Sequence, residues 1–190
     1  MSNTNNESIE NRKTVARQEI ASIDKTKKLA LAGILLALSL LGANLKLFGD
    51  SIAFDSAPAF LAALLLGPTY GAFLGASGHL LSAAFAAFPL GMPVHLITAT
   101  SMAIIMAAHG YIKIQLSDKI VAIAIRIIIA LLMNVFIATL PLVPLLGCPL
   151  VQALWIKLLI AAVPNVLLAE LIYFIVKKNN LLKIQSNNID

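Results

Sequence analysis

The sequence predicts an all-α membrane protein, a bundle of six transmembrane helices with both termini in the cytoplasm. Hydrophobic residues make up 59% of the 190 residues, charged residues make up 12%, and the mean hydropathy is +0.90. Soluble domains carry about 25% charged residues, so a chain this apolar is expected to bury its surface against lipid. Lysine and arginine gather before the first apolar segment and after the last one. Because cytoplasmic flanks are rich in these residues, the pattern places both termini inside.

The length and composition fit one membrane domain between two polar tails. We expect a cytoplasmic N-terminal tail over residues 1–26, a six-helix domain over 27–178 and a cytoplasmic C-terminal tail over 179–190. The N-terminal tail has no apolar run of the kind found in a signal peptide, and its polar composition predicts disorder. The basic residues flank a membrane domain and form no nucleic-acid patch, so no nucleic-acid partner is expected.

The first three helical segments are predicted over residues 29–45, 52–66 and 69–88. The second segment stops at Gly67 and Pro68, and it is short against the roughly 20 residues that a membrane crossing needs. If it only entered the membrane and returned, five crossings would remain and one basic flank would lie outside, against the charge rule.

The last three segments are predicted over residues 93–111, 120–140 and 150–176. Pro93 suits the first turn of a helix. Pro164 lies inside the last segment, where a proline usually bends a membrane helix and neighbouring groups satisfy the freed carbonyl.

Motifs for nucleotide hydrolysis and for common metal sites are absent from the sequence. It contains no G-x-x-x-x-G-K-[ST], no H-E-x-x-H and no C-x-x-C, so no metal site of these types and no cofactor is expected. An intramembrane enzyme using His79, His95 and Asp55 stays open, but no G-x-S-x-G turn supports it. Binding or transport is favoured, no catalytic residue is assigned, and an assembly protein without a ligand is the third reading.

Polar residues at membrane depth are costly and tend to mark function. Asp55, His95, Asn134 and Trp155 come from four segments yet share one depth in the outer half of the membrane, which predicts a pocket open to the outside. Aromatic residues that could stack there on a planar ligand are Phe54, Phe88 and Trp155. The alternative is a salt bridge of Asp55 with Lys157 or Lys46, and Trp155 in the interfacial belt.

Two further polar residues have two readings each. His79 lies deeper in the third segment, beside glycines that permit close helix packing, and it either bonds a neighbouring helix or reaches the ligand. Asn165 follows Pro164 and either caps the interrupted backbone or reaches the ligand.

Arg126 and Glu170 predict an ion pair in the cytoplasmic half. Each lies seven residues from a flanking lysine, Lys119 or Lys177, or roughly 10 Å from the membrane edge at 1.5 Å per residue. The two segments are neighbours in sequence, so we expect a structural ion pair. The alternative is that Arg126 extends to the headgroups.

Small residues recur at helical spacing on the first segment, at Ala30, Gly33 and Ala37. Such a face lets another helix approach closely. The default partner is an internal helix, and the alternative is a second protein.

Three motifs carry a family resemblance: D-S-x-P at residues 55–58, G-H-L-L-S-A at 78–83 and P-L-G-x-P-x-H at 89–95. With the size and topology of residues 27–178, they resemble the substrate-binding S component of energy-coupling factor (ECF) vitamin transporters, in particular the alpha-ribazole branch. The resemblance implies an ECF S-component-like bundle in the bacterial plasma membrane. Such a protein binds a vitamin precursor from outside, and a membrane coupling subunit and two ATP-hydrolysing subunits supply the energy.

The resemblance also implies a substrate and a set of site residues. The best candidate substrate is alpha-ribazole, used for cobalamin synthesis, with pantothenate or riboflavin as alternatives. The resemblance favours His95, Asn134, Trp155 and Asn165 as substrate-binding residues. Asp55 and His79 belong to the motifs of the alpha-ribazole branch, which either touch the ligand or pack the helices, and they complete the set of candidates. The implied coupling-subunit interface is Ala30, Gly33 and Ala37, where Gly33 stands in place of the family's first alanine.

Overall fold

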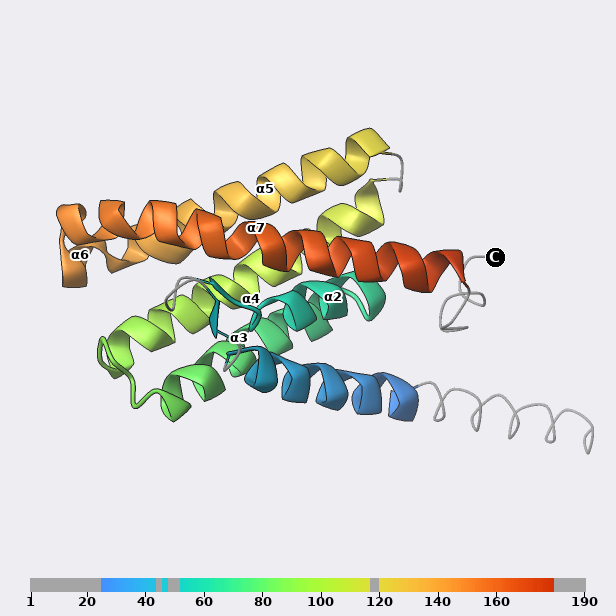
Figure 1. Cartoon of the computed structure of the whole chain (residues 1–190), viewed down its shortest axis with the longest axis horizontal. Helices are drawn as coiled ribbons and strands as arrows, with labels where there is room; N and C mark the ends of the chain where they lie inside the picture. The colour runs from blue at the N-terminus through green and yellow to red at the C-terminus, as the bar shows by residue number, and fades with distance from the viewer. Residues whose placement is uncertain (1–24, 44–45, 48–51, 117–119, 180–190) are drawn as a thin grey trace, which may run out of the picture.

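Each predicted segment contains a helix in the computed structural model, which describes residues 25–43, 46–47, 52–116 and 120–179 (Figure 1). The helices are Lys25–Ala43, α2 (Ala57–Leu65), α3 (Pro68–Phe85), α4 (Met92–Gln115), α5 (Ile120–Thr139), α6 (Val143–Leu146) and α7 (Cys148–Lys178), with a 3-10 turn, η1 (Leu140–Leu142), before α6. Most of the two predicted tails, and Lys119, lie outside the described residues.

The predicted second segment is wrong at its start. Residues 52–53 form strand β2 (Ile52–Ala53), which pairs antiparallel with β1 (Lys46–Leu47), and α2 begins only at Ala57. The turn residues Asp55 and Ser56 separate strand from helix, and a proline in the first turn of α2 fixes the helical start.

The nine residues of α2 span about 13.5 Å at 1.5 Å per residue, less than half of a hydrocarbon core about 30 Å thick. Four helical stretches in the described part of the chain are long and apolar enough to cross a membrane. They are Lys25–Ala43, α4 (Met92–Gln115), Ile120–Leu146, which combines α5, η1 and α6, and α7 (Cys148–Lys178). The chain is therefore a helical membrane protein, and six crossings stay a prediction.

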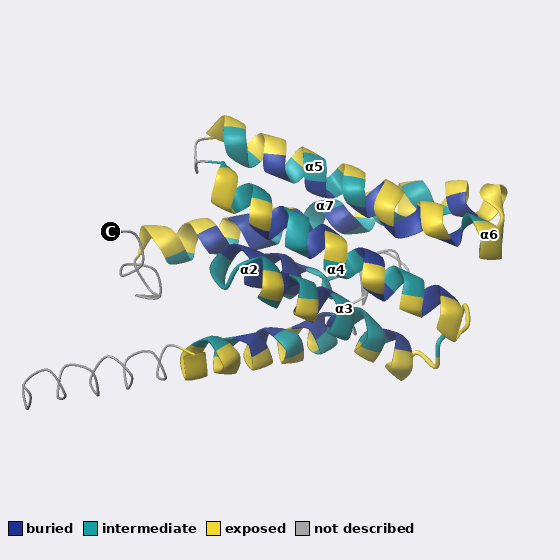
Figure 2. Ribbon diagram, turned by 180° about the vertical axis from the view of Figure 1, so that it is seen from behind, coloured by how far each residue is buried: buried dark blue, intermediate teal, exposed yellow. Residues whose placement is uncertain are grey.

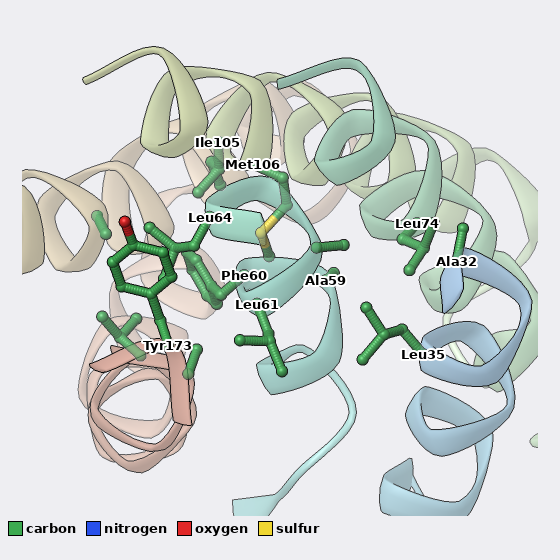
Figure 3. Close-up of a cluster of buried hydrophobic side chains, with 14 of the residues drawn as sticks. Ala32, Leu35, Ala59, Phe60, Leu61, Leu64, Leu74, Ile105, Met106 and Tyr173 are labelled. Atoms are coloured by element: carbon green, nitrogen blue, oxygen red, sulfur yellow. The ribbon is translucent and has the colours of Figure 1, made fainter. Parts of the chain in front are cut away.

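The core of the bundle is built around α2, of which seven residues are buried. Phe60 and Leu64 of α2 are enclosed by Leu74 of α3 and by Ile105 and Met106 of α4 (Figure 3). The same cluster reaches Leu35 on one side and Tyr173 on the other. Exposed apolar residues cover the outer faces of the longer helices (Figure 2), as expected for surfaces that face lipid.

Glycines let α3 lie close to three neighbours, as the sequence predicted for the glycines beside His79. A Cβ on Gly71 would come within 2.5 Å of the Ala63 Cβ in α2. One on Gly75 would come within 2.9 Å of a backbone oxygen in α4, and one on Gly78 within 2.8 Å of the Ser39 hydroxyl. Such distances are too short for a side chain, so glycine is required for this packing.

The start of the helix Lys25–Ala43 and the end of α7 lie at the same end of the bundle, together with the end of α4 and the start of α5 (Figure 1). The α3–α4 turn and α6 lie at the opposite end. The described lysines of the two basic flanks, in the first turn of the helix Lys25–Ala43 and the last turn of α7, are therefore on one side of the molecule.

The small-residue face of the helix Lys25–Ala43 points away from the bundle. Ala30, Gly33 and Ala37 are exposed, whereas Ala32 and Leu35 pack into the core (Figure 2). A Cβ added to Gly33 would meet nothing within 4 Å. The expectation that this face packs against an internal helix is therefore wrong for the described part of the chain, because another face of the helix, with Ala32, Leu35 and Ser39, packs against the bundle.

Candidate functional site

A cavity of about 340 Å³ lies between α3, α4, α5, α7 and the segment before α2. Small-molecule sites in proteins usually measure about 300–1,000 Å³ and combine apolar walls with a few polar groups. Nine of the seventeen lining residues are leucine, alanine, valine or methionine, and the other eight are polar residues from five segments. The cavity is therefore of the size and chemistry of a small-molecule site.

Five of the six predicted substrate-binding residues line this cavity: Asp55, His79, His95, Asn134 and Asn165. They come from positions far apart in the sequence, and the structure brings them together. Trp155 is not among the lining residues. Its indole Nε1 donates a hydrogen bond of 3.0 Å to the Thr139 hydroxyl, which does line the cavity, so Trp155 supports the wall from behind.

The two histidines form a contact across α3 and α4. The Nδ1 atom of His95 lies 3.2 Å from Nε2 of His79, and the ring centroids are 5.3 Å apart. This confirms the reading in which His79 bonds a neighbouring helix, and the partner is itself a predicted site residue. Phe88 packs edge-on against His95 with centroids 5.6 Å apart. Its positive φ of 51° belongs to the turn between α3 and α4 that positions this ring.

Asn165 joins α7 to the start of α2. Its Oδ1 accepts a 2.7 Å hydrogen bond from the backbone N–H of Ala57, and its Nδ2 donates a 2.8 Å bond to the carbonyl of Ala161. The first N–H groups of a helix have no partner within the helix, so Asn165 supplies one from a different helix. The side chain thus caps backbone, as one of its two readings expected, although the cap is on α2, and it also lines the cavity.

Replacing Asn165 by leucine should lower the free energy of unfolding by about 1–3 kcal/mol, because the buried Ala57 N–H would lose its acceptor. Asn165→Gln is the matched control, since it keeps an amide oxygen for Ala57 and an amide nitrogen for Ala161 without adding a buried charge, and it should lose less. Thermal unfolding of the detergent-solubilised protein measures both. Equal loss in the two variants would show that the bond to Ala57 contributes little.

Asp55 places a carboxyl group at the cavity beside its own backbone N–H and that of Ser56. The Ser39 hydroxyl donates to the Asp55 carbonyl and ties this turn to the helix Lys25–Ala43. Lys157 is exposed and forms no ion pair with Asp55 among the described side chains, so that alternative is wrong. The side chain of Lys46 lies outside the described ones.

A second polar centre lies on α4, α5 and α7, away from the cavity. The Arg126 Nε and Nη2 atoms donate to the two carboxylate oxygens of Glu170 at 2.7 and 2.6 Å. Arg126 is fully buried, so the ion pair is confirmed and the alternative of Arg126 at the headgroups is wrong. None of the residues of this centre lines the cavity.

His109 completes this centre and was missed from the sequence. Its Nε2 lies 3.3 Å from Glu170 Oε1, and its ring meets Phe60 edge-on at 5.0 Å. A histidine near the predicted cytoplasmic end of the fourth segment was the available signal. No group of three described His, Cys, Asp or Glu residues has the arrangement of a metal site.

Comparison with known proteins gives one result that bears on identity. A family model described as "ECF transporter, substrate-specific component" matches residues 27–177. A search of curated protein sequences finds no match to this chain.

Proposed function

The chain belongs to the family of ECF transporter substrate-specific components, and from this premise we propose that it captures a vitamin precursor, with alpha-ribazole as the best candidate. Members of the family are transporter subunits, and they act on a small molecule with a membrane coupling subunit and ATP-hydrolysing subunits. The observation that carries the proposal is the convergence of five polar side chains on one cavity of about 340 Å³.

The chemistry of the wall suits a planar base joined to a sugar. Apolar side chains such as Met102 and Leu158 line the cavity and can pack against the face of a heteroaromatic ring. Asp55, His95 and Asn134 offer hydrogen-bonding groups for hydroxyls. In this proposal the ring lies against the apolar wall and the ribose against the polar groups, and Trp155 acts through Thr139.

We place the protein in the bacterial plasma membrane with six crossings and both termini in the cytoplasm. The helix Lys25–Ala43 begins and α7 ends at one end of the bundle, and basic flanks favour the cytoplasmic side. His95 near the start of α4 and Asn134 near the end of α5 lie toward the other end, which puts the cavity in the outer half.

The exposed face at Ala30, Gly33 and Ala37 is proposed as the contact with the coupling subunit. Close approach of a partner helix needs small residues, so Gly33→Trp should abolish uptake by cells that contain the complete transporter while substrate binding to the purified subunit is kept. Gly33→Ala, which meets no neighbour within 4 Å, is the control and should retain uptake. Normal uptake by the tryptophan variant would remove this face from the interface.

The substrate proposal is tested by calorimetric titration of the purified protein with alpha-ribazole, riboflavin and pantothenate. Saturable binding of alpha-ribazole in a one-to-one ratio is expected. Binding of riboflavin or pantothenate alone would keep the capture role and remove alpha-ribazole. Chemical conversion of a bound compound, followed by chromatography, would favour the enzyme alternative instead.

A further inference from the structure

The cavity wall is one-sided in charge. Asp55 is the one acidic residue among the described side chains that line it, and no lysine or arginine is among them. The basic side chains of α7 are elsewhere: Lys157 is exposed, and Lys177 and Lys178 lie in the last turn. Arg126 is occupied by Glu170. An anionic ligand would therefore meet a carboxyl group and no described lysine or arginine.

Several polar groups of the wall are already bound to protein. Thr98 donates to the carbonyl of Val94, and Thr139 donates to that of Val135 while accepting from Trp155. Both ends of the Asn165 amide are engaged with backbone. These residues shape the cavity but have little left to offer a ligand.

Two buried nitrogen atoms of the wall have no hydrogen-bond partner among the described groups, His95 Nε2 and Asn134 Nδ2. An amide nitrogen only donates, whereas an imidazole nitrogen donates or accepts according to its tautomer. In the contact between His95 Nδ1 and His79 Nε2, one nitrogen donates and the other accepts. The ring that accepts is neutral, so at most one of the two histidines can be a cation. Both atoms are covered by protein, and buried polar groups without partners are costly, so a rotation of either side chain toward the cavity would let a ligand satisfy its unpaired nitrogen.

We propose that this cavity selects its ligand by charge, accepting a neutral or cationic heteroaromatic compound that donates hydrogen bonds and excluding compounds that carry a carboxylate or phosphate. The inference rests on the proposed function, since it assumes that the cavity is the substrate site. Asp55 accepts hydrogen bonds from hydroxyl or amine groups of the ligand, and Asn134 Nδ2 donates to a ring nitrogen or oxygen. His95 Nε2 donates or accepts according to its tautomer. With the Asp55 carboxyl group ionised, an anion would place two negative charges together in a poorly solvated site, where like charges repel strongly.

The sharpest probes are alpha-ribazole and its 5′-phosphate, because they differ only in the charged group. The titration is made at pH 8, where a histidine side chain with the ordinary pKa of about 6.5 is neutral. At this pH a phosphate ester, with a second pKa near 6, carries close to two negative charges. Titration calorimetry should give an affinity for the phosphate at least about 100-fold weaker. Thiamine and riboflavin serve as further cationic and neutral probes, and pantothenate and biotin as carboxylates.

The outcomes separate this inference from the proposed function. Equal binding of alpha-ribazole and its phosphate, or tight binding of a carboxylate vitamin, would overturn charge selection and leave substrate capture intact. Binding of riboflavin or thiamine alone would support charge selection and remove alpha-ribazole as the substrate. Binding of none of the probes would overturn both.

Asp55→Asn tests whether this carboxyl group is the source of the selectivity. We expect the ratio of the two affinities to fall at least tenfold, whereas Asp55→Glu, which keeps the charge, should preserve most of it. Thermal unfolding establishes that both variants are folded. If Asp55→Asn does not fold, Asn134→Asp gives the opposite test, because a second carboxyl group should widen the ratio. An unchanged ratio in the folded variant would overturn the assignment to Asp55.

Discussion

Replacing Ala162 by phenylalanine is expected to reduce substrate affinity at least about 100-fold while the protein stays folded. Ala162 is 4% exposed and lines the cavity from α7. A phenyl ring there would enter the empty volume instead of packed neighbours, so the strain of overpacking should be small. A hundredfold loss corresponds to about 2.8 kcal/mol of binding free energy, which is reasonable when a ring takes the place of the ligand.

Ala153→Phe is the matched control, since it makes the same change on an exposed position of the same helix. Its affinity should equal that of the unmodified protein in calorimetric titration with whichever compound binds. Unchanged affinity in the Ala162 variant would place the substrate outside this cavity.

Replacing Arg126 by methionine should destabilise the protein more than any single change at the cavity. Arg126 is 0% exposed and Glu170 is 7% exposed, so the substitution leaves a buried carboxylate whose remaining partner among the described residues is His109. Removing one partner of a buried ion pair typically costs about 3–5 kcal/mol. Chemical denaturation in mixed micelles, followed by circular dichroism, should show this loss.

The double variant Arg126→Met with Glu170→Leu removes both charges together. Because replacing a buried ion pair by apolar residues is often nearly neutral, it should recover most of the stability lost in the single variant. Lys157→Met, at an exposed cation of α7, is the control and should change little. A double variant as unstable as Arg126→Met would indicate that packing around Arg126, rather than its charge, is what matters.

The sequence located every helix except the four-residue α6, because each of the others is an apolar run bounded by glycine, proline or charge. It also predicted the ion pair of Arg126 and Glu170, since equal distance from the basic edges gives equal depth on neighbouring antiparallel helices. The start of α2 was wrong because the pairing of residues 46–47 with 52–53 leaves no signal in hydropathy.

Depth alone did not determine which side chains face the cavity. Trp155 shares the depth of the site, but Leu154 and Leu158 line the cavity in its place. Successive residues on a helix point about 100° apart, so rotating a helix by one residue changes which side chain faces the cavity. That rotation is set by how the helix packs against its neighbours. The same limit concealed His109, whose contact with Glu170 depends on how α4 and α7 are rotated.

The close contacts along α3 have a consequence for transport. Gly71, Gly75 and Gly78 bring this helix against three neighbours with no space for even a methyl group, and sliding by one turn would drive larger side chains into those positions. The four helices joined in this way should therefore tilt together as one rigid body when cargo crosses the bilayer. Access would then be controlled by the orientation of the whole subunit in its assembly, and not by an internal hinge.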